Sequence, residues 1–333
     1  MSAAPSLRSI SDRTLNRLII AIALVLLVGV PAVAAIYYFD RNVDAGPSLP
    51  DRNVASMEQA VRDNPNLVSS RLGLATSYTE ARRWSDAIVQ YGEVLRIDTA
   101  NGGALLGRAN ASEQLGDVDA AAADYQAIID SGKGAEMAKV NPLLESAYYR
   151  LGAIQLQQGK SREAIESFVA ALKIDRGDAD AMYLLGTAYL KEDEPEKAVF
   201  AFHEAVKFIP TGWCEPYQQM AQGFTALKQT EGVQYATGMA AFCAGRPEEG
   251  KAALQPLVDG QFGLDALLGL GYIAESQSDW STAKDSFTRA LAKDAQSFNA
   301  NQGLNRANAA LNGGPPPAAS PATSASPAAT GSN

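Results

Sequence analysis

Histidine and cysteine are scarce in this chain of 333 residues, which has one histidine, His203, and two cysteines, Cys214 and Cys243. A zinc site needs three or four closely spaced ligands, and a histidine-based triad needs a nucleophile motif near its histidine. Motifs of the forms GxGxxG after a strand, GxxxxGK before Ser or Thr, and HExxH are also missing. We therefore predict no catalytic, metal or cofactor site, and we expect His203 at the surface or at the edge of a groove.

Basic residues are also in deficit. Lysine and arginine total 28 against 37 acidic residues, which gives a formal net charge of −9. Nucleic-acid binding needs clustered positive charge to neutralise phosphates, so this balance argues against DNA or RNA as a partner. Alanine is abundant and β-branched runs are few outside the N-terminal segment, which favours helices. The length exceeds what one small core accommodates, so several domains or one elongated domain is expected.

Long uncharged runs are absent except at residues 18–39, where 22 apolar and small residues follow one another. That length is enough to cross a bilayer core of about 30 Å. The excess of positive charge on its N-terminal side predicts residues 1–17 in the cytoplasm and the rest of the chain outside it. We expect a signal-anchor helix over 18–39 and a linker over 40–52. The basic residues that precede the run are Arg8, Arg13 and Arg17.

The same run permits a second interpretation, a cleaved signal peptide. Pro31 interrupts the apolar stretch, and the sequence Ala-Val-Ala ending at Ala34 has the form of a cleavage site. The apolar stretch continues beyond that site to a spanning length, which favours the uncleaved anchor. Both interpretations export the remainder of the chain.

A spacing of 34 residues recurs in the central part of the chain. Leu151-Gly152, Ala164, Phe168 and Ala171 return 34 residues later as Leu185-Gly186, Ala198, Phe202 and Ala205. A fixed period of this size indicates an array of one supersecondary unit. Each unit is predicted to contain two helices, with Gly152 and Ala164 at their crossing, where a larger side chain would force the helix axes apart.

These residues resemble the tetratricopeptide repeat. The shared features are the Leu-Gly pair, the central alanine, the aromatic residue four positions later and the later alanine, and they extend over about residues 53–311. The resemblance implies an all-α fold, a right-handed superhelical solenoid of antiparallel helix pairs with a concave inner face. With the anchor, one transmembrane helix precedes it. Residues 312–333, rich in Pro, Ala and Ser, are predicted to be a disordered tail.

The period breaks in two places, and each end is atypical. Extra residues near 131–142 predict an extended loop or an added short turn. Between Gly186 and Gly238 the spacing is 18 residues longer than one repeat, so an additional helix is expected at about 214–228. Residues 53–64 match a second helix alone and are expected to cap the array. A C-terminal helix ending at Leu311 is expected to cover the last unit.

Cys214 begins the additional helix and Cys243 ends the helix after it. In an antiparallel pair the start of the first helix lies beside the end of the second, so the two thiols are expected to meet. An exported domain permits their oxidation, and we predict a disulfide. The alternative is a pair of buried, reduced cysteines that act as small apolar residues.

A ligand would bind on the first helices of the units, which line the inside of such a stack. Tyrosine offers contact area and a hydroxyl at low entropic cost, which suits peptide capture. The alternative for these side chains is the core, where they would contact only neighbouring helices. The predicted groove residues are Tyr149, Tyr183, Asn110, Tyr235, Met239 and Tyr272.

We therefore expect a membrane-anchored protein-binding scaffold or assembly factor, not an enzyme, that captures a peptide segment of another envelope protein. Relatives that bind acidic chaperone C-termini use inward Lys and Asn early in the array, and here those positions hold Leu72 and Thr76. No small-molecule substrate is expected. The alternative is a structural subunit of a larger envelope or surface assembly that associates through the edges of the solenoid. An enzyme would need a carboxylate pair that the sequence does not identify.

Overall fold

The computed structural model describes residues 27, 29–33, 49–134 and 138–314. No strand occurs among these residues, and the chain from residue 49 onward is a succession of helices. The α-helices are α2 Leu49–Asp63, α3 Val68–Glu80, α4 Trp84–Ile97, α5 Gly102–Gln114, α6 Val118–Gly132, α7 Pro142–Gln157, α8 Ser161–Ile174, α9 Ala179–Lys191, α10 Pro195–Phe208, α11 Glu215–Ala226, α12 Thr230–Cys243, α13 Pro247–Leu254, α14 Gly263–Ser276, α15 Trp280–Lys293 and α16 Phe298–Leu311. Two short 3₁₀ helices are η1 Ala138–Val140 and η2 Gln255–Leu257.

No helix in the described ranges is both long and apolar enough to cross a membrane. The anchor predicted at 18–39 falls almost entirely outside those ranges, apart from a helical stretch at 29–33. Residues 1–17 and most of the tail at 312–333 also lie outside them.

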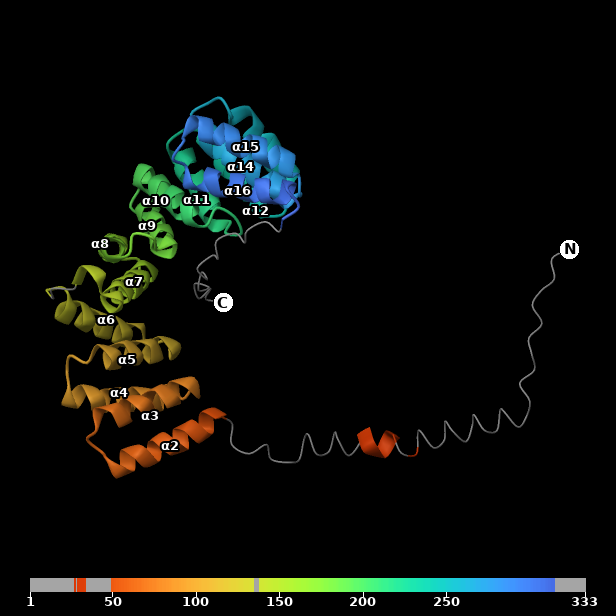
Figure 1. Cartoon of the computed structure of the whole chain (residues 1–333). Coiled ribbons are helices and arrows are strands. Elements are labelled where there is room, and N and C mark those ends of the chain that lie inside the picture. The colour runs from red at the N-terminus through yellow and green to blue at the C-terminus, as the bar shows by residue number, and fades with distance from the viewer. Residues whose placement is uncertain (1–26, 28, 34–48, 135–137, 315–333) are drawn as a thin grey trace, which may run out of the picture.

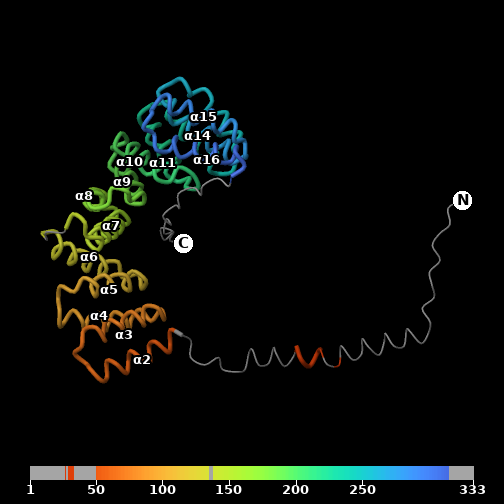
Figure 2. Tube along the Cα trace, viewed as in Figure 1, coloured from red at the N-terminus to blue at the C-terminus, as the bar shows by residue number. Residues whose placement is uncertain are grey.

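Consecutive helices pack as antiparallel neighbours and stack into a curved array (Figures 1 and 2). The first helices of successive units contact one another, in the series α3, α5, α7, α9 and α11. This contact places the first helices on the shorter side of the curve, and α4, α6, α8 and α10 on the longer side. Figure 1 shows the arc from α2 to α10, with α11–α16 gathered into a tighter coil at its far end. The predicted helical solenoid is confirmed.

Local sequence sets where the helices begin. Side chains at the N-cap positions accept hydrogen bonds from backbone N–H groups in the first turn, which otherwise have no partner within the helix. Proline at the first helical position, as in α7, α10 and α13, restricts the backbone to helical angles and needs no donor there. The side chains that cap in this way are Asn101, Asp117, Asn141, Asp178, Asp279 and Ser297.

Small residues stand where the paired helices cross, as the repeat predicts. A Cβ atom on Gly152 would lie 2.9 Å from the ring of Phe168, and one on Gly186 would lie 2.6 Å from the ring of Phe202. Both phenylalanines are completely buried. The glycine and the aromatic residue are therefore one packing device: the absent side chain on the first helix makes room for the ring on the second.

Both interruptions of the period have a structural counterpart. The inserted residues near 131–142 extend α6 to Gly132 and form η1, so the insertion contains an added short turn. The additional helix predicted at 214–228 is α11, which packs against α10 on one side and α12 on the other. At the two ends, α2 covers α3, and α16 covers α15 and contacts α14.

Candidate functional site

Two rings predicted for the groove, Tyr149 on α7 and Tyr183 on α9, are partly buried on first helices. Each packs against the phenylalanine of its own unit. The centroid distance is 6.3 Å from Tyr149 to Phe168 and 5.9 Å from Tyr183 to Phe202. Because first helices occupy the shorter side of the curve, these tyrosines belong to its inner side.

The loop between α10 and α11 adds a third ring that the repeat pattern does not predict. Trp213 packs edge-on against Tyr183, with ring centroids 5.1 Å apart. The Tyr183 hydroxyl accepts a hydrogen bond from Gln219 Nε2 at 2.7 Å, and Thr187 Oγ1 donates to Gln219 Oε1 at 2.9 Å. These contacts restrain the orientation of the tyrosine. We call Tyr149, Tyr183 and Trp213 the inner aromatic surface.

Trp213 is adjacent to one end of a disulfide. Cys214, before α11, is bonded to Cys243 at the end of α12, with the two Cα atoms 5.5 Å apart. The predicted pairing is therefore confirmed, and it follows from the antiparallel arrangement of α11 and α12. The bond ties the loop that carries Trp213 to the body of the repeat domain.

Carboxylates surround the two tyrosines. Burial, followed by the negative charge of Asp180, raises the pKa of Tyr149 to about 12. Burial, followed by interaction with Asp178, raises the pKa of Glu145 to about 7. Glu145 lies one helical turn before Tyr149, so the charged groups and the inner aromatic surface are neighbours. This inner side carries acidic groups and would repel an acidic chain terminus.

Glu145 gives the fold a predicted pH dependence. Its folded pKa of about 7 exceeds the ordinary value of 4.5, so the neutral carboxyl stabilises the fold below about pH 4.5. This contribution is lost as pH rises through about 7, and with solvent screening we expect on the order of 1 kcal/mol. Urea unfolding at pH 5 and pH 8 measures it. Glu145→Gln should remove this part of the difference, whereas Glu166→Gln, at an exposed position on α8, should retain it. An unchanged pH dependence in Glu145→Gln would contradict the assignment.

Three of the predicted groove residues lie in the core instead. The exposed fractions are 4% for Tyr235, 2% for Met239 and 7% for Tyr272. The ring of Tyr235 stacks on Phe262 at 5.8 Å, and that of Tyr272 packs against Phe287 at 5.6 Å. The expectation that these side chains face an open groove is wrong, because the C-terminal helices coil tightly enough to fill their own inner side.

Asn110 is on a first helix and partly buried, as predicted, but its side chain has a structural partner. Its Oδ1 accepts a hydrogen bond from the Tyr125 hydroxyl at 2.8 Å. Tyr125 is completely buried, and burial, followed by the charge of Glu113, raises its pKa. Asn110 therefore satisfies a buried phenol of the next helix.

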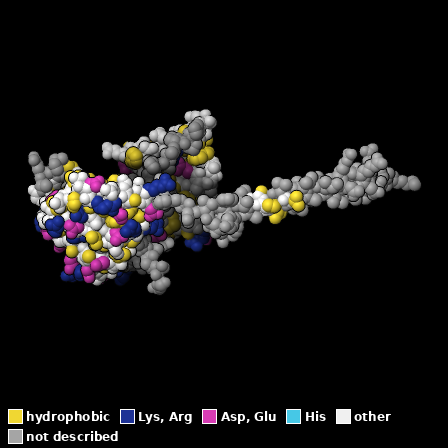
Figure 3. All heavy atoms as spheres, turned by 90° about the horizontal axis from the view of Figure 1, so that it is seen from below, with side chains coloured by type: hydrophobic (Ala, Val, Ile, Leu, Met, Phe, Trp, Pro, Cys, Tyr) yellow, Lys and Arg dark blue, Asp and Glu magenta, His cyan; other side chains and the backbone are white. Residues whose placement is uncertain are grey.

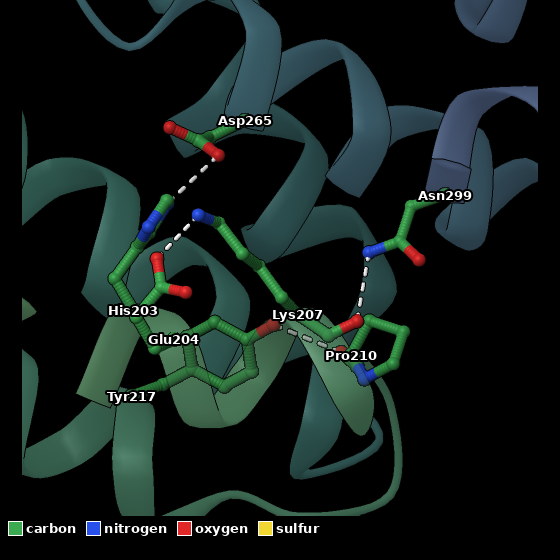
Figure 4. A network of polar contacts seen from close by, with 7 residues as sticks. All are labelled: His203, Glu204, Lys207, Pro210, Tyr217, Asp265 and Asn299. Carbon is green, nitrogen blue, oxygen red and sulfur yellow. Dashed lines mark hydrogen bonds and ion pairs between the residues drawn. The ribbon is translucent and has the colours of Figure 1, made fainter. Parts of the chain in front are cut away.

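The closure of the C-terminal coil depends on contacts between residues far apart in sequence (Figure 4). His203 Nε2 on α10 lies 3.0 Å from Asp265 Oδ1 on α14. Asn299 Nδ2 on α16 donates to the backbone oxygen of Lys207 at 3.1 Å, across 92 positions. Tyr217 donates to the backbone oxygen of Pro210 at 2.9 Å. The cavity beside these groups measures about 30 Å³, which is room for a water molecule and not for a peptide.

Comparison with known proteins agrees with this architecture. Two family models described as tetratricopeptide repeat match the chain, one over residues 155–222 and the other over residues 72–136 and 235–300. No curated protein matches the sequence.

Solved structures share the fold at low sequence identity. YrrB, described as a TPR protein with an unusual peptide-binding site, is 15% identical, with a TM-score of 0.51 over 61% of this chain and 99% of its own. The C-terminal part of a TPR repeat-containing protein from Cytophaga hutchinsonii is 17% identical, with a TM-score of 0.49 over 81% of this chain and 98% of its own. The family models and the helix pairs together show that this chain contains tetratricopeptide repeats, a fold that indicates protein or peptide partners.

Proposed function

We propose that this protein is a membrane-anchored scaffold or assembly factor that captures a peptide segment of another envelope protein on its inner aromatic surface. The observation that carries the proposal is the pair of tyrosines on consecutive first helices, extended by Trp213 against Tyr183 at 5.1 Å. Rings of this kind supply contact area at low entropic cost. The neighbouring carboxylates favour a segment that carries Lys or Arg.

The C-terminal coil supports the same assignment by elimination. Its inner side is filled by Tyr235, Met239 and Tyr272, so the open inner side belongs to the units from α3 to α9. Figure 3 shows acidic and basic side chains mixed on one face of the array, with no continuous basic patch there for nucleic acid. YrrB, which shares this fold, is described as having a peptide-binding site of its own. Its likeness to this chain extends to the fold.

The anchor at residues 18–39 and the export of residues 53–311 are part of the proposal. They rest on the apolar run and the arginines before it. Protease added to intact cells stripped of any outer barrier should digest the repeat domain. Full protection of the repeat domain would contradict the orientation, and release of the chain from membranes by alkaline carbonate would contradict the anchor.

Capture is tested by affinity purification from detergent-solubilised membranes, with crosslinking and mass spectrometry to identify the partner. The double variant Tyr149→Ala, Tyr183→Ala is expected to recover at least about tenfold less of the partner, because paired aromatic anchors often dominate binding energy. Tyr189→Ala, which removes a ring elsewhere on α9, is the matched control and should capture at the wild-type level.

Helical content measured by circular dichroism must be equal in the three proteins. If the double variant captures the partner normally, the inner aromatic surface is not the site. The alternative of a structural subunit that associates through the solenoid edges would then be favoured.

A further inference from the structure

A second concave feature lies on the opposite side of the array, between α8 and α10. Since first helices pack closely on the inner side, the second helices diverge on the outer side and leave α9 as the floor between them. The resulting groove has a volume of about 360 Å³. We call it the outer groove, and its apolar lining consists of Leu172, Met182, Leu185, Tyr189, Phe200 and Ala201.

Phe200 distinguishes this groove from the ordinary surface of a repeat. It lies on the rim with 67% of its surface exposed. The position 34 residues earlier, with the same place in the preceding unit, is the exposed Glu166. A solvated carboxylate is the expected residue on the outside of a helix, and a phenylalanine there exposes apolar area without a packing reason.

The floor differs in the same direction. Tyr189 and Ala201 correspond to Gln155 and Ser167 one repeat earlier. In that unit Ser167 Oγ donates to Gln155 Oε1 at 2.8 Å, so the positions are joined by a polar contact. At the outer groove both positions are apolar. The change from polar to apolar at three equivalent positions marks a surface suited to a partner and not to water.

The chain covers its preceding unit with its own insertion but leaves this one open. The 3₁₀ helix η1 contacts α8, and Ala138 packs against the adjacent core cluster. Between Gly152 and Gly186 the spacing is one plain repeat, so no corresponding insertion follows α8. An outer site of the array therefore already accommodates a short chain segment in this molecule.

The rim charges select the chemistry of the occupant. Lys197 is paired with Glu194 and lies 5.3 Å from the centroid of the Tyr189 ring, and Glu204 is paired with Lys207. Glu196 is exposed and makes no hydrogen bond or ion pair within the described residues. The uncompensated charge on the rim is thus a carboxylate, which is complementary to Lys or Arg.

We propose that the outer groove is a second docking site, for an amphipathic segment of a protein partner that inserts aliphatic or aromatic side chains and places Lys or Arg beside Glu196. The site is separate from the inner aromatic surface. The tail at 312–333 contains no charged residue and no aliphatic or aromatic side chain larger than alanine apart from proline, so it lacks the required chemistry. A helix laid in a groove between two helices is a common mode of such recognition.

The test uses the purified full chain and a fluorescent 14-residue helical peptide with leucines on one face and lysines flanking them, followed by fluorescence anisotropy. A second peptide has glutamate in place of every lysine. Phe200→Glu is expected to weaken binding of the lysine peptide at least about tenfold, because it places a charge on the apolar rim. Glu196→Lys should weaken the lysine peptide and strengthen the glutamate peptide, each by about threefold or more.

Glu166→Lys is the matched control, because it makes the same charge change at the equivalent outer position of Phe200 one repeat earlier. It should leave the affinity within about twofold. An equal loss in Glu166→Lys and Glu196→Lys, or a failure of the lysine peptide to saturate, overturns the proposal in favour of non-specific attraction. The Tyr149→Ala, Tyr183→Ala variant should bind the peptide normally, which separates this result from the test of the inner aromatic surface.

Two other occupants give distinct outcomes. If sedimentation shows a dimer that Phe200→Glu dissociates, the outer groove is an interface between two copies and the proposal is overturned. If deletion of residues 1–17 or of 312–333 strengthens peptide binding at least about tenfold, the chain occupies its own groove and the proposal is also overturned. A monomer whose affinity is unchanged by either deletion supports an external partner.

Discussion

Phe287→Ala is expected to lower the free energy of unfolding of the repeat domain by about 3–5 kcal/mol. The ring is completely buried on α15. Glycines on the two neighbouring helices approach it closely: a Cβ atom on Gly271 would lie 2.5 Å from the ring, and one on Gly303 would lie 2.4 Å from it. The ring therefore fills the space between α14 and α16, and neither glycine has a side chain with which to fill the cavity that alanine would leave.

Urea unfolding followed by circular dichroism measures this loss. Thr288→Ala, at the next position of α15 and exposed, is the control and should change the free energy of unfolding by less than about 1 kcal/mol. Gly303→Ala should destabilise the parent protein but cost less in the Phe287→Ala background, because the two groups compete for one space. Additive effects, or a loss below about 1 kcal/mol in Phe287→Ala, would contradict the packing described here.

Replacement of both Cys214 and Cys243 by alanine is expected to lower the free energy of unfolding by about 3 kcal/mol. The bond joins residues separated by 29 positions, and its main effect is to restrict the unfolded chain. The loop before α11 should also lose its restraint, and with it the contact between Trp213 and Tyr183. The disulfide thus contributes both to stability and to the geometry of the inner aromatic surface.

The local effect can be measured separately from the global one. In a background with Trp84→Phe and Trp280→Phe, the fluorescence of Trp213 reports on its environment alone. Removing the disulfide should shift the emission to longer wavelength while the helical content stays unchanged under native conditions. The parent background treated with a reductant should give the same spectrum. An unchanged emission after loss of the bond would show that other contacts hold Trp213.

The features that depend on periodicity could be predicted from the sequence. Gly152, Gly186, Phe168 and Phe202 recur at the repeat interval, and each has the packing role that the interval implies. The disulfide was also predictable, because it requires only that consecutive helices be antiparallel. Such features depend on neighbours within one or two helices, which the local sequence specifies.

The inner side was predicted less well because it depends on how sharply each successive unit turns. The same repeat position is partly exposed at Tyr183 and buried at Tyr272, since small changes in crossing angle accumulate along the array. His203 and Asp265 are 62 positions apart, so no spacing rule connects them. Trp213 lies in a loop, where the repeat makes no statement about side-chain direction.

The bridge from Asn299 to the backbone of Lys207 makes the two parts of the array mechanically unlike. In the units from α3 to α9, force applied along the axis meets only nearest-neighbour interfaces, and the ribbon behaves as a soft spring whose curvature follows its load. Beyond α10 the coil is fastened back upon itself, so it resists extension as a ring does. A cargo held by the pliable units would accordingly be carried on a stiff base, with the elasticity confined to the part that grips it.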